Sequence, residues 1–165
     1  MSSDFRVRVK QCSVCLAKVT KTSLKDTVHI SCQPGFPGKC LAIDLVGPYP
    51  ESNGYRYVLT AQDAFTRFVK AFPLKNKESA TIARVLIDQY ISTFGVPQKL
   101  HSDNAKEFLS DIFHHLCDRF QIKRTTTPTY NPQSNPVERF HCSLNQMMRI
   151  LLDREDTKWV KYILF

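Results

Sequence analysis

The sequence lacks long apolar stretches. No uninterrupted apolar run reaches the roughly 20 residues that a membrane-spanning helix needs, and the opening MSSDFRVRVK has no apolar core of the kind found in signal peptides. It also contains no internal repeat and no low-complexity tract. These absences argue against a membrane-embedded chain or a repeat array, and we expect an intracellular protein with no membrane partner.

Metal-binding cysteine patterns are also scarce. The chain has six cysteines, but without a secretory signal we do not expect a disulfide framework. Only Cys12 and Cys15 have a metal-like spacing, and residues 1–11 contain no histidine. Half a site cannot close a tetrahedral zinc shell. His29 and Cys32 could in principle complete it but fall in a linker, so we expect an incomplete zinc site at Cys12 and Cys15, with zinc unlikely in this chain.

Basic residues exceed acidic ones, and the excess is uneven. The formal net charge is +8, and residues 1–39 contribute +5 of it, from seven basic and two acidic residues. A basic arm suits a polyanion such as nucleic acid, although a solvated tail would look the same. The length fits one domain plus an extension.

The apolar patterns predict an α/β fold. Five strands are indicated: CLAIDLVGP, YRYVLTAQDAF, RFVKAFPL, QKLHSD and IKRTTTP. Four helices are indicated: residues 79–94, 109–120, 137–153 and a last one from about 157. This order predicts a mixed sheet flanked by helices. In the first helix the residues that share an apolar face are Ala83, Ile87, Tyr90, Ile91 and Phe94. In the second, the residues expected to point inward are Ile112, Phe113, Leu116 and Phe120. In the third, the apolar side consists of Phe140, Leu144, Met147, Met148 and Leu151.

Three acids stand at unusual places. Asp44 interrupts an apolar strand, where an unpaired charge is costly; Asp103 ends a strand; and Glu138 begins a helix after a Pro- and Asn-rich loop. Each has a structural alternative: an Arg or Lys could neutralise Asp44, Asp103 could cap a turn, and Glu138 fits a capping box with Asn135. Together, converging carboxylates can bind Mg²⁺ or Mn²⁺, and two such ions clamp both oxygens of a phosphodiester displacement.

Three blocks around these acids, LAIDLVGPYP, HSDNAKEF and TTPTYNPQSNPVERFH, resemble the signatures of the integrase catalytic core of retroviruses and gypsy-class LTR retrotransposons. The resemblance covers roughly residues 40–165 and implies a ribonuclease H-like fold with a mixed five-stranded sheet. It also implies an Asp-Asp-Glu site in which Asp44, Asp103 and Glu138 are catalytic and hold Mg²⁺ or Mn²⁺. The implied reaction is DNA integration by polynucleotidyl transfer, namely 3′-end processing and strand transfer.

The same resemblance implies DNA as the partner, a homo-oligomer (dimer or higher) when active, and action in the nucleus. The residues expected to contact DNA are Asn104, Lys106, Tyr130, Asn131, Gln133, Ser134 and Arg139. Residues 1–38 are then expected to be a basic extension that contains half of the family's zinc module and a linker. Residues 39–165 would be the catalytic core, truncated at its C-terminal end.

Two departures from the family pattern keep alternatives open. Ala105 stands where the family commonly has Gly, and alanine would be strained if that turn needs a positive φ. Between Asp103 and Glu138 there are 34 residues, one fewer than usual in the family. The alternatives are a catalytically inactive remnant that binds nucleic acid, and a ribonuclease H-like nuclease that cuts without joining.

Overall fold

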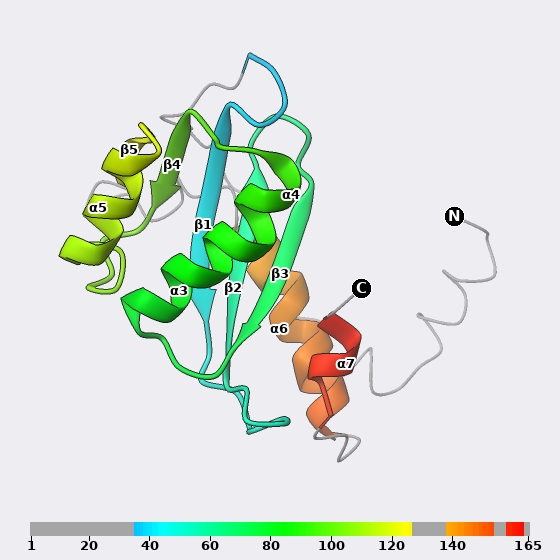
Figure 1. The fold of residues 1–165 in the computed structure, drawn as a ribbon. Helices are drawn as coiled ribbons and strands as arrows, with labels where there is room; N and C mark the ends of the chain where they lie inside the picture. Colours follow the sequence, from blue (N-terminus) through cyan, green and yellow to red (C-terminus); the bar gives the residue numbers. More distant parts are fainter. Residues whose placement is uncertain (1–34, 127–137, 154–157, 164–165) are drawn as a thin grey trace, which may run out of the picture.

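A mixed five-stranded sheet forms the centre of the protein, as predicted. The computed structural model describes residues 35–126, 138–153 and 158–163 (Figure 1). The strands are β1 (Cys40–Val46), β2 (Tyr57–Asp63), β3 (Val69–Leu74), β4 (Lys99–Ser102) and β5 (Lys123–Thr126), in the spatial order β3-β2-β1-β4-β5. The first three strands form an antiparallel meander, and β4 and β5 then add parallel to β1.

The helices are α3 (Ser79–Val85), η1 (Leu86–Ile91), α4 (Ser92–Phe94), α5 (Asp111–Arg119), α6 (Glu138–Asp153) and α7 (Val160–Ile163). The first three form one continuous helical stretch that ends at Gly95, whose φ is 86°. Its middle part, η1, is π-helical, and a π turn takes an additional residue and so rotates the later residues about the helix axis. Ile82 and Leu86 are buried, whereas Phe94, which follows η1 and was predicted to share the apolar face, is 47% exposed.

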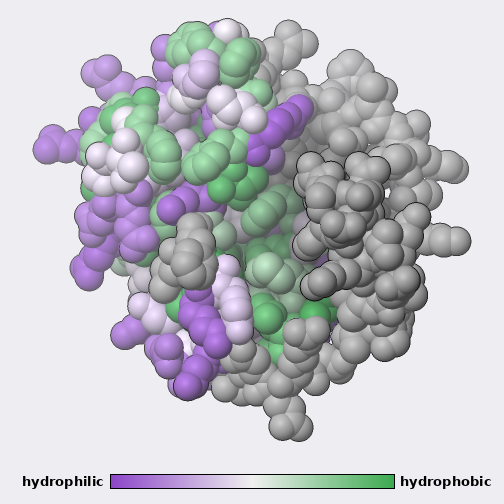
Figure 2. Space-filling model, turned by 90° about the vertical axis from the view of Figure 1, so that its right-hand side faces the viewer, coloured by the Kyte–Doolittle hydropathy of each residue, from purple (hydrophilic) through white to green (hydrophobic). Residues whose placement is uncertain are grey.

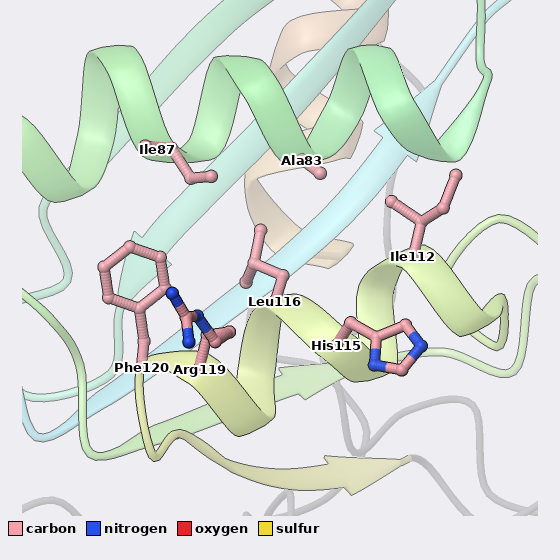
Figure 3. Close-up of a pocket in the computed structure, with 7 residues that line it drawn as sticks. All are labelled: Ala83, Ile87, Ile112, His115, Leu116, Arg119 and Phe120. Carbon is pink, nitrogen blue, oxygen red and sulfur yellow. The ribbon is translucent and has the colours of Figure 1, made fainter.

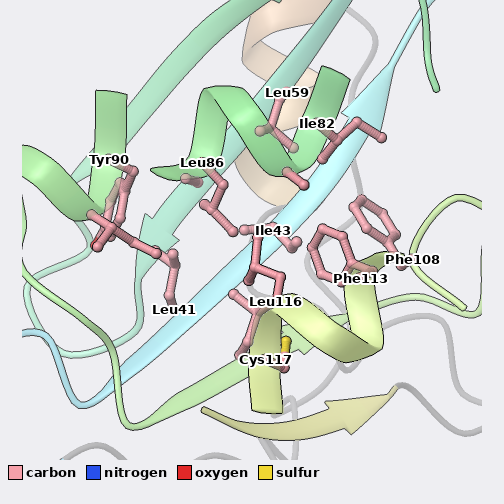
Figure 4. Packing of buried hydrophobic residues seen from close by; sticks show 14 of the residues in the cluster. Leu41, Ile43, Leu59, Ile82, Leu86, Tyr90, Phe108, Phe113, Leu116 and Cys117 are labelled. Carbon is pink, nitrogen blue, oxygen red and sulfur yellow. The ribbon is translucent and has the colours of Figure 1, made fainter. Parts of the chain in front are cut away.

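The larger core lies between the sheet and the layer formed by α3, η1 and α5 (Figure 4). In β1, Leu41 and Ile43 point into this core, so that the alternating residues face the other side of the sheet. The Ser110 hydroxyl caps α5 by accepting a hydrogen bond from the Phe113 backbone N–H. Phe113 is fully buried, but its neighbour Ile112 is 48% exposed and does not face the core as predicted, because the buried stripe of this short helix follows residues 113, 116 and 117.

The opposite face of the sheet is covered by α6 and α7 (Figure 1). Their cluster with β2 contains Val58, Leu144, Met148, Trp159, Val160 and Ile163. Met148 is 1% exposed, whereas Met147, predicted to lie on the apolar side of the helix, is 37% exposed because it lies beside the row formed by positions 140, 144, 148 and 151.

Two hydrogen bonds join this layer to the segment after β1. The Tyr49 hydroxyl lies 2.6 Å from Asn145 Oδ1, and Trp159 Nε1 donates to the Pro50 carbonyl at 2.7 Å. Burial raises the pKa of Tyr49 to about 12, so that its hydroxyl remains a donor at neutral pH. The position of α6 relative to β1 is thus fixed by both packing and polar contacts.

Some large hydrophobic side chains remain at the surface. The rings of Phe68 and Tyr90 both contact that of Phe94, with centroids 5.6 and 5.0 Å apart, and Phe65 and Phe68 are each half exposed. On the face shown in Figure 2, hydrophilic residues gather along one side, and hydrophobic residues lie toward the top and in the central hollow. Among the described residues, no helix is long and apolar enough to cross a membrane.

The thiols differ in state. Cys117 is buried and Cys142 exposed, and both are free. Cys40, at the start of β1, is disulfide-bonded, which the cysteine spacing gave no reason to expect.

Candidate active site

The register of β1 and β4 places two of the predicted carboxylates side by side. The strands are parallel, and Ala42 of β1 is paired with His101 of β4. Two residues further along each strand come Asp44 and Asp103, at the same end of the sheet. Carboxyl ends of parallel strands are common places for functional side chains in α/β proteins. The fold therefore brings together acids that are 59 residues apart in the sequence.

Asp44 and Asp103 line one pocket of about 240 Å³. Glu107 and Lys77 also line it, and they form an ion pair with 2.8 Å between Nζ and Oε1. The hydrogen bond from Lys77 holds the pKa of the Glu107 carboxyl below its usual range. The Lys77 ammonium already neutralises Glu107. Asp44 and Asp103 are therefore the better candidates in this pocket for binding a metal ion.

Asp103 shapes the turn after β4. Its Oδ1 accepts a hydrogen bond from the Ala105 backbone N–H at 3.1 Å, so the turn-forming role considered for it is present. Positive φ values at non-glycine residues in the described part of the chain occur at Asn53, Arg67 and Gln121. Ala105 is therefore not strained, and its substitution for Gly leaves this turn unimpaired.

Asp44 is held by its own strand and by α6. Its Oδ1 accepts from the Leu45 N–H at 2.7 Å, and its Oδ2 lies 3.4 Å from His141 Nδ1. His141 Nε2 in turn lies 2.7 Å from the Thr60 hydroxyl of β2. Burial lowers the pKa of His141 to about 4, which favours the neutral ring at pH 7. Its contact with Asp44 is the close approach of Nδ1 to Oδ2 at 3.4 Å.

His141 was not predicted as a site residue. The sequence did carry a signal for it: ERFH places the histidine three residues after Glu138, and residues three apart lie on the same face of a helix. An Arg or Lys is one possible partner that would neutralise Asp44; among the contacts between described residues, the structure places a histidine beside this carboxylate.

Glu138 is the first residue of α6, one helical turn before His141. Its backbone is thus carried by the same helix that contacts Asp44, although the side chains of Glu138 and Arg139 are not among those described. Asn104 and Lys106 are exposed next to Asp103. The other predicted DNA-binding and zinc residues lie outside the described residues: Tyr130, Asn131, Gln133, Ser134, Cys12 and Cys15.

The oxygen ligands of this pocket fit a divalent cation such as Mg²⁺. That ion is usually bound through one or two carboxylates together with water and substrate phosphates, rather than by a complete protein cage. Asp44 and Asp103 supply such a pair at an open pocket. Among the described residues, no three His, Cys, Asp or Glu side chains are grouped closely enough to hold an ion, so a third ligand would have to come from elsewhere, for example from Glu138.

A larger hollow of about 560 Å³ lies between α3 and α5 (Figure 3). Ala83 and Ile87 form one wall, and Ile112, Leu116 and Phe120 contribute to the other, with His115 and Arg119 beside them. In the part of the chain that the structure describes, no carboxylate lines this hollow. Its size therefore does not make it the active site, and the chemistry points to the smaller pocket at Asp44 and Asp103.

Comparisons with known proteins identify the family of the chain. A family model for the integrase core domain matches residues 36–132, more than half of the chain. The chain is 28% identical over 161 residues to the "Retrovirus-related Pol polyprotein from transposon 412" of Drosophila melanogaster, a match that covers 96% of the chain and 13% of that polyprotein. It is 30% identical over 165 residues to the "Pro-Pol polyprotein" of Feline foamy virus, covering 99% of the chain and 14% of the polyprotein. The chain thus spans only a small part of these relatives.

Solved structures show the same fold. The crystal structure of the catalytic core domain of BIV integrase has a TM-score of 0.55 and 25% sequence identity, with 71% of this chain and 73% of that one covered. A chain of the simian T-cell lymphotropic virus intasome, solved by cryo-EM in complex with PP2A regulatory subunit B56 gamma, has a TM-score of 0.67 and 22% identity. That match covers 96% of this chain and 60% of the intasome chain.

Proposed function

Since this chain belongs to the integrase core domain family, we propose that it is the catalytic core of a retrotransposon-type integrase and transfers DNA strands with the help of Mg²⁺ or Mn²⁺. The reactions would be hydrolytic trimming of a DNA 3′ end and attack of the resulting 3′ hydroxyl on a target phosphodiester. The observation that carries the proposal is that Asp44, within β1, and Asp103, directly after the parallel neighbouring strand β4, line one pocket.

The chain's own residues have distinct roles in this proposal. Asp44 and Asp103 bind the cation through carboxylate oxygens, and Glu138, at the start of α6, is the third acid. The cation, when bound, stabilises charge on the attacking and leaving oxygens of the phosphodiester. The ion pair between Lys77 and Glu107 keeps the Glu107 carboxylate from competing for the cation.

DNA would approach across the mouth of this pocket. Asn104 and Lys106 are exposed beside Asp103 and are placed to meet the phosphate backbone. We propose the same role for Tyr130, Asn131, Gln133, Ser134 and Arg139, and an electrostatic contribution from residues 1–38. We further propose that the active form is a dimer or higher homo-oligomer that acts in the nucleus, and that residues 39–165 are the core itself.

The test is strand transfer with a labelled donor DNA. Asp103→Asn should abolish the magnesium-dependent joined product while the circular dichroism spectrum remains that of the wild type. The matched control is Asp88→Asn, the same change at an exposed aspartate of η1, in the helical layer on the opposite face of the sheet from α6. It should retain transfer.

Two outcomes would refute the proposal. DNA binding by the wild type without any metal-dependent product would identify a binding remnant. Cleavage without joining would identify a nuclease.

A further inference from the structure

His141 links three elements of the site. It lies in the first turn of α6, and its ring stands between the Asp44 carboxylate of β1 and the Thr60 hydroxyl of β2, at 3.4 and 2.7 Å. The side chains of His141 and Asp44 are only 13% and 17% exposed. Each ring nitrogen of His141 therefore has a polar neighbour. Packing of α6 on the sheet would not by itself require these two contacts.

The partners decide which ring nitrogen carries the proton. A carboxylate can only accept, so an attractive contact with Asp44 requires a proton on Nδ1, and Nε2 then accepts from the Thr60 hydroxyl. In the other tautomer, the Nδ1 lone pair would face the carboxylate, and Thr60 would donate to the Asp44 carbonyl, 3.0 Å away. A hydrogen bond to an ionised carboxylate is stronger than one between a hydroxyl and a carbonyl, so the Nδ1–H tautomer is favoured.

Both oxygens of Asp44 have a neighbour. The Leu45 N–H donates to Oδ1 at 2.7 Å, and His141 Nδ1 lies 3.4 Å from Oδ2. Asp44 lines the pocket, but His141 is not among the residues that do. Nor do Asp44, Asp103 and His141, all of them described, form a group that could hold one ion. The ring thus supports Asp44 from behind rather than joining it as a ligand.

We infer that His141 is a positioning residue, which orients the Asp44 carboxylate toward the cation through Nδ1–H and is itself oriented by Thr60. This rests on the proposed function, since it takes Asp44 to be a metal-binding acid. The inference adds His141, in its Nδ1–H form, to the acids of the proposed site. Outer contacts of this kind are typically worth roughly 10- to 100-fold in metal affinity.

Two conservative variants separate the ring's two contacts. In His141→Asn, the side-chain amide N–H falls near the place of Nδ1 and can still donate to Asp44. In His141→Gln, the longer side chain brings its amide near the place of Nε2, within reach of Thr60 but not of Asp44. Binding of Mn²⁺ to the full 165-residue chain, measured by electron paramagnetic resonance, should stay near the wild-type value for Asn and weaken roughly tenfold or more for Gln.

The tautomer can be read directly. In ¹⁵N-histidine NMR spectra of the metal-free chain, His141 should show the Nδ1–H form, and Thr60→Val should weaken that preference. A dominant Nε2–H form, or equal Mn²⁺ binding by the Gln variant and the wild type, would overturn the inference. Asp44→Asn distinguishes this from a failure of the proposed function: if that variant binds Mn²⁺ as the wild type does, the metal site itself is wrong. Urea unfolding of the Asn and Gln variants at equal midpoints rules out a purely structural effect.

Discussion

Replacing Met148 by Ala should loosen the docking of α6 far more than the same replacement at its neighbour Met147. Met148 is 1% exposed and packs in the cluster between α6, α7 and β2, whereas Met147 is 37% exposed on the flank of the helix. A fully buried Met→Ala change costs about 2–5 kcal/mol, because transfer free energy is lost and a cavity remains. At the partly exposed position we expect about 1 kcal/mol or less.

Urea unfolding followed by tryptophan fluorescence suits this comparison. The chain has a single tryptophan, Trp159, which belongs to the same cluster as Met148. With a urea slope of about 1–3 kcal/mol per molar for a small domain, the Met148 variant should unfold at a midpoint lower by roughly 1 M or more. The Met147 variant should unfold close to the wild type. Equal midpoint shifts for the two variants would refute the assignment of the buried face of α6.

Three further predictions concern charge and metal. Burial raises the pKa of Asp63, but hydrogen bonds from Thr66 and Gly38 lower it by more, so the folded-state pKa lies below the unfolded one; this stabilisation is present above about pH 4 and is lost as the pH falls further. Stability measured from about pH 6 to 2 should therefore fall less steeply for Asp63→Asn, and equal slopes would contradict the argument. Deleting residues 1–34, which removes six basic and two acidic residues but keeps Gly38, should make the salt dependence of DNA binding shallower; an unchanged slope would mean that this segment is a passive tail. Metal analysis of the purified chain should find no stoichiometric zinc, because Cys12 and Cys15 supply only two of four ligands, and a tightly held zinc that is lost in Cys12→Ser would show this to be wrong.

Local patterns were enough to predict the elements and two of the acids. A short apolar run indicated the first strand, and β-branched and aromatic residues indicated the next two. The charge of Asp44 within β1 was conspicuous because its neighbours are all apolar. Asp103 was found because it ends a strand. The order of the strands in the sheet was not predicted, since pairing between β1 and β4 depends on contacts that no local pattern encodes.

Side-chain directions were harder to predict. Phe94 lies after the π-helical segment η1, which the regular helical periodicity of residues 79–94 did not predict, and it is exposed rather than on the buried face. Ile112 and Met147 are apolar residues at the edge of an amphipathic stripe, where periodicity does not separate a buried from an exposed position. His141 was missed because its significance appears only when β1, β2 and α6 are assembled.

The strand order also separates the two halves of the proposed site along the chain. The meander of β1, β2 and β3 pairs segments that are neighbours in the sequence, all within residues 40–74. Asp44 is then in place but has no acidic neighbour from β4, because β4 pairs with β1 only after the chain has crossed over through α3, η1 and α4. Such distant pairing is slow compared with hairpin formation. The strand of Asp44 can therefore find its antiparallel partners before the proposed acidic pair with Asp103 is complete.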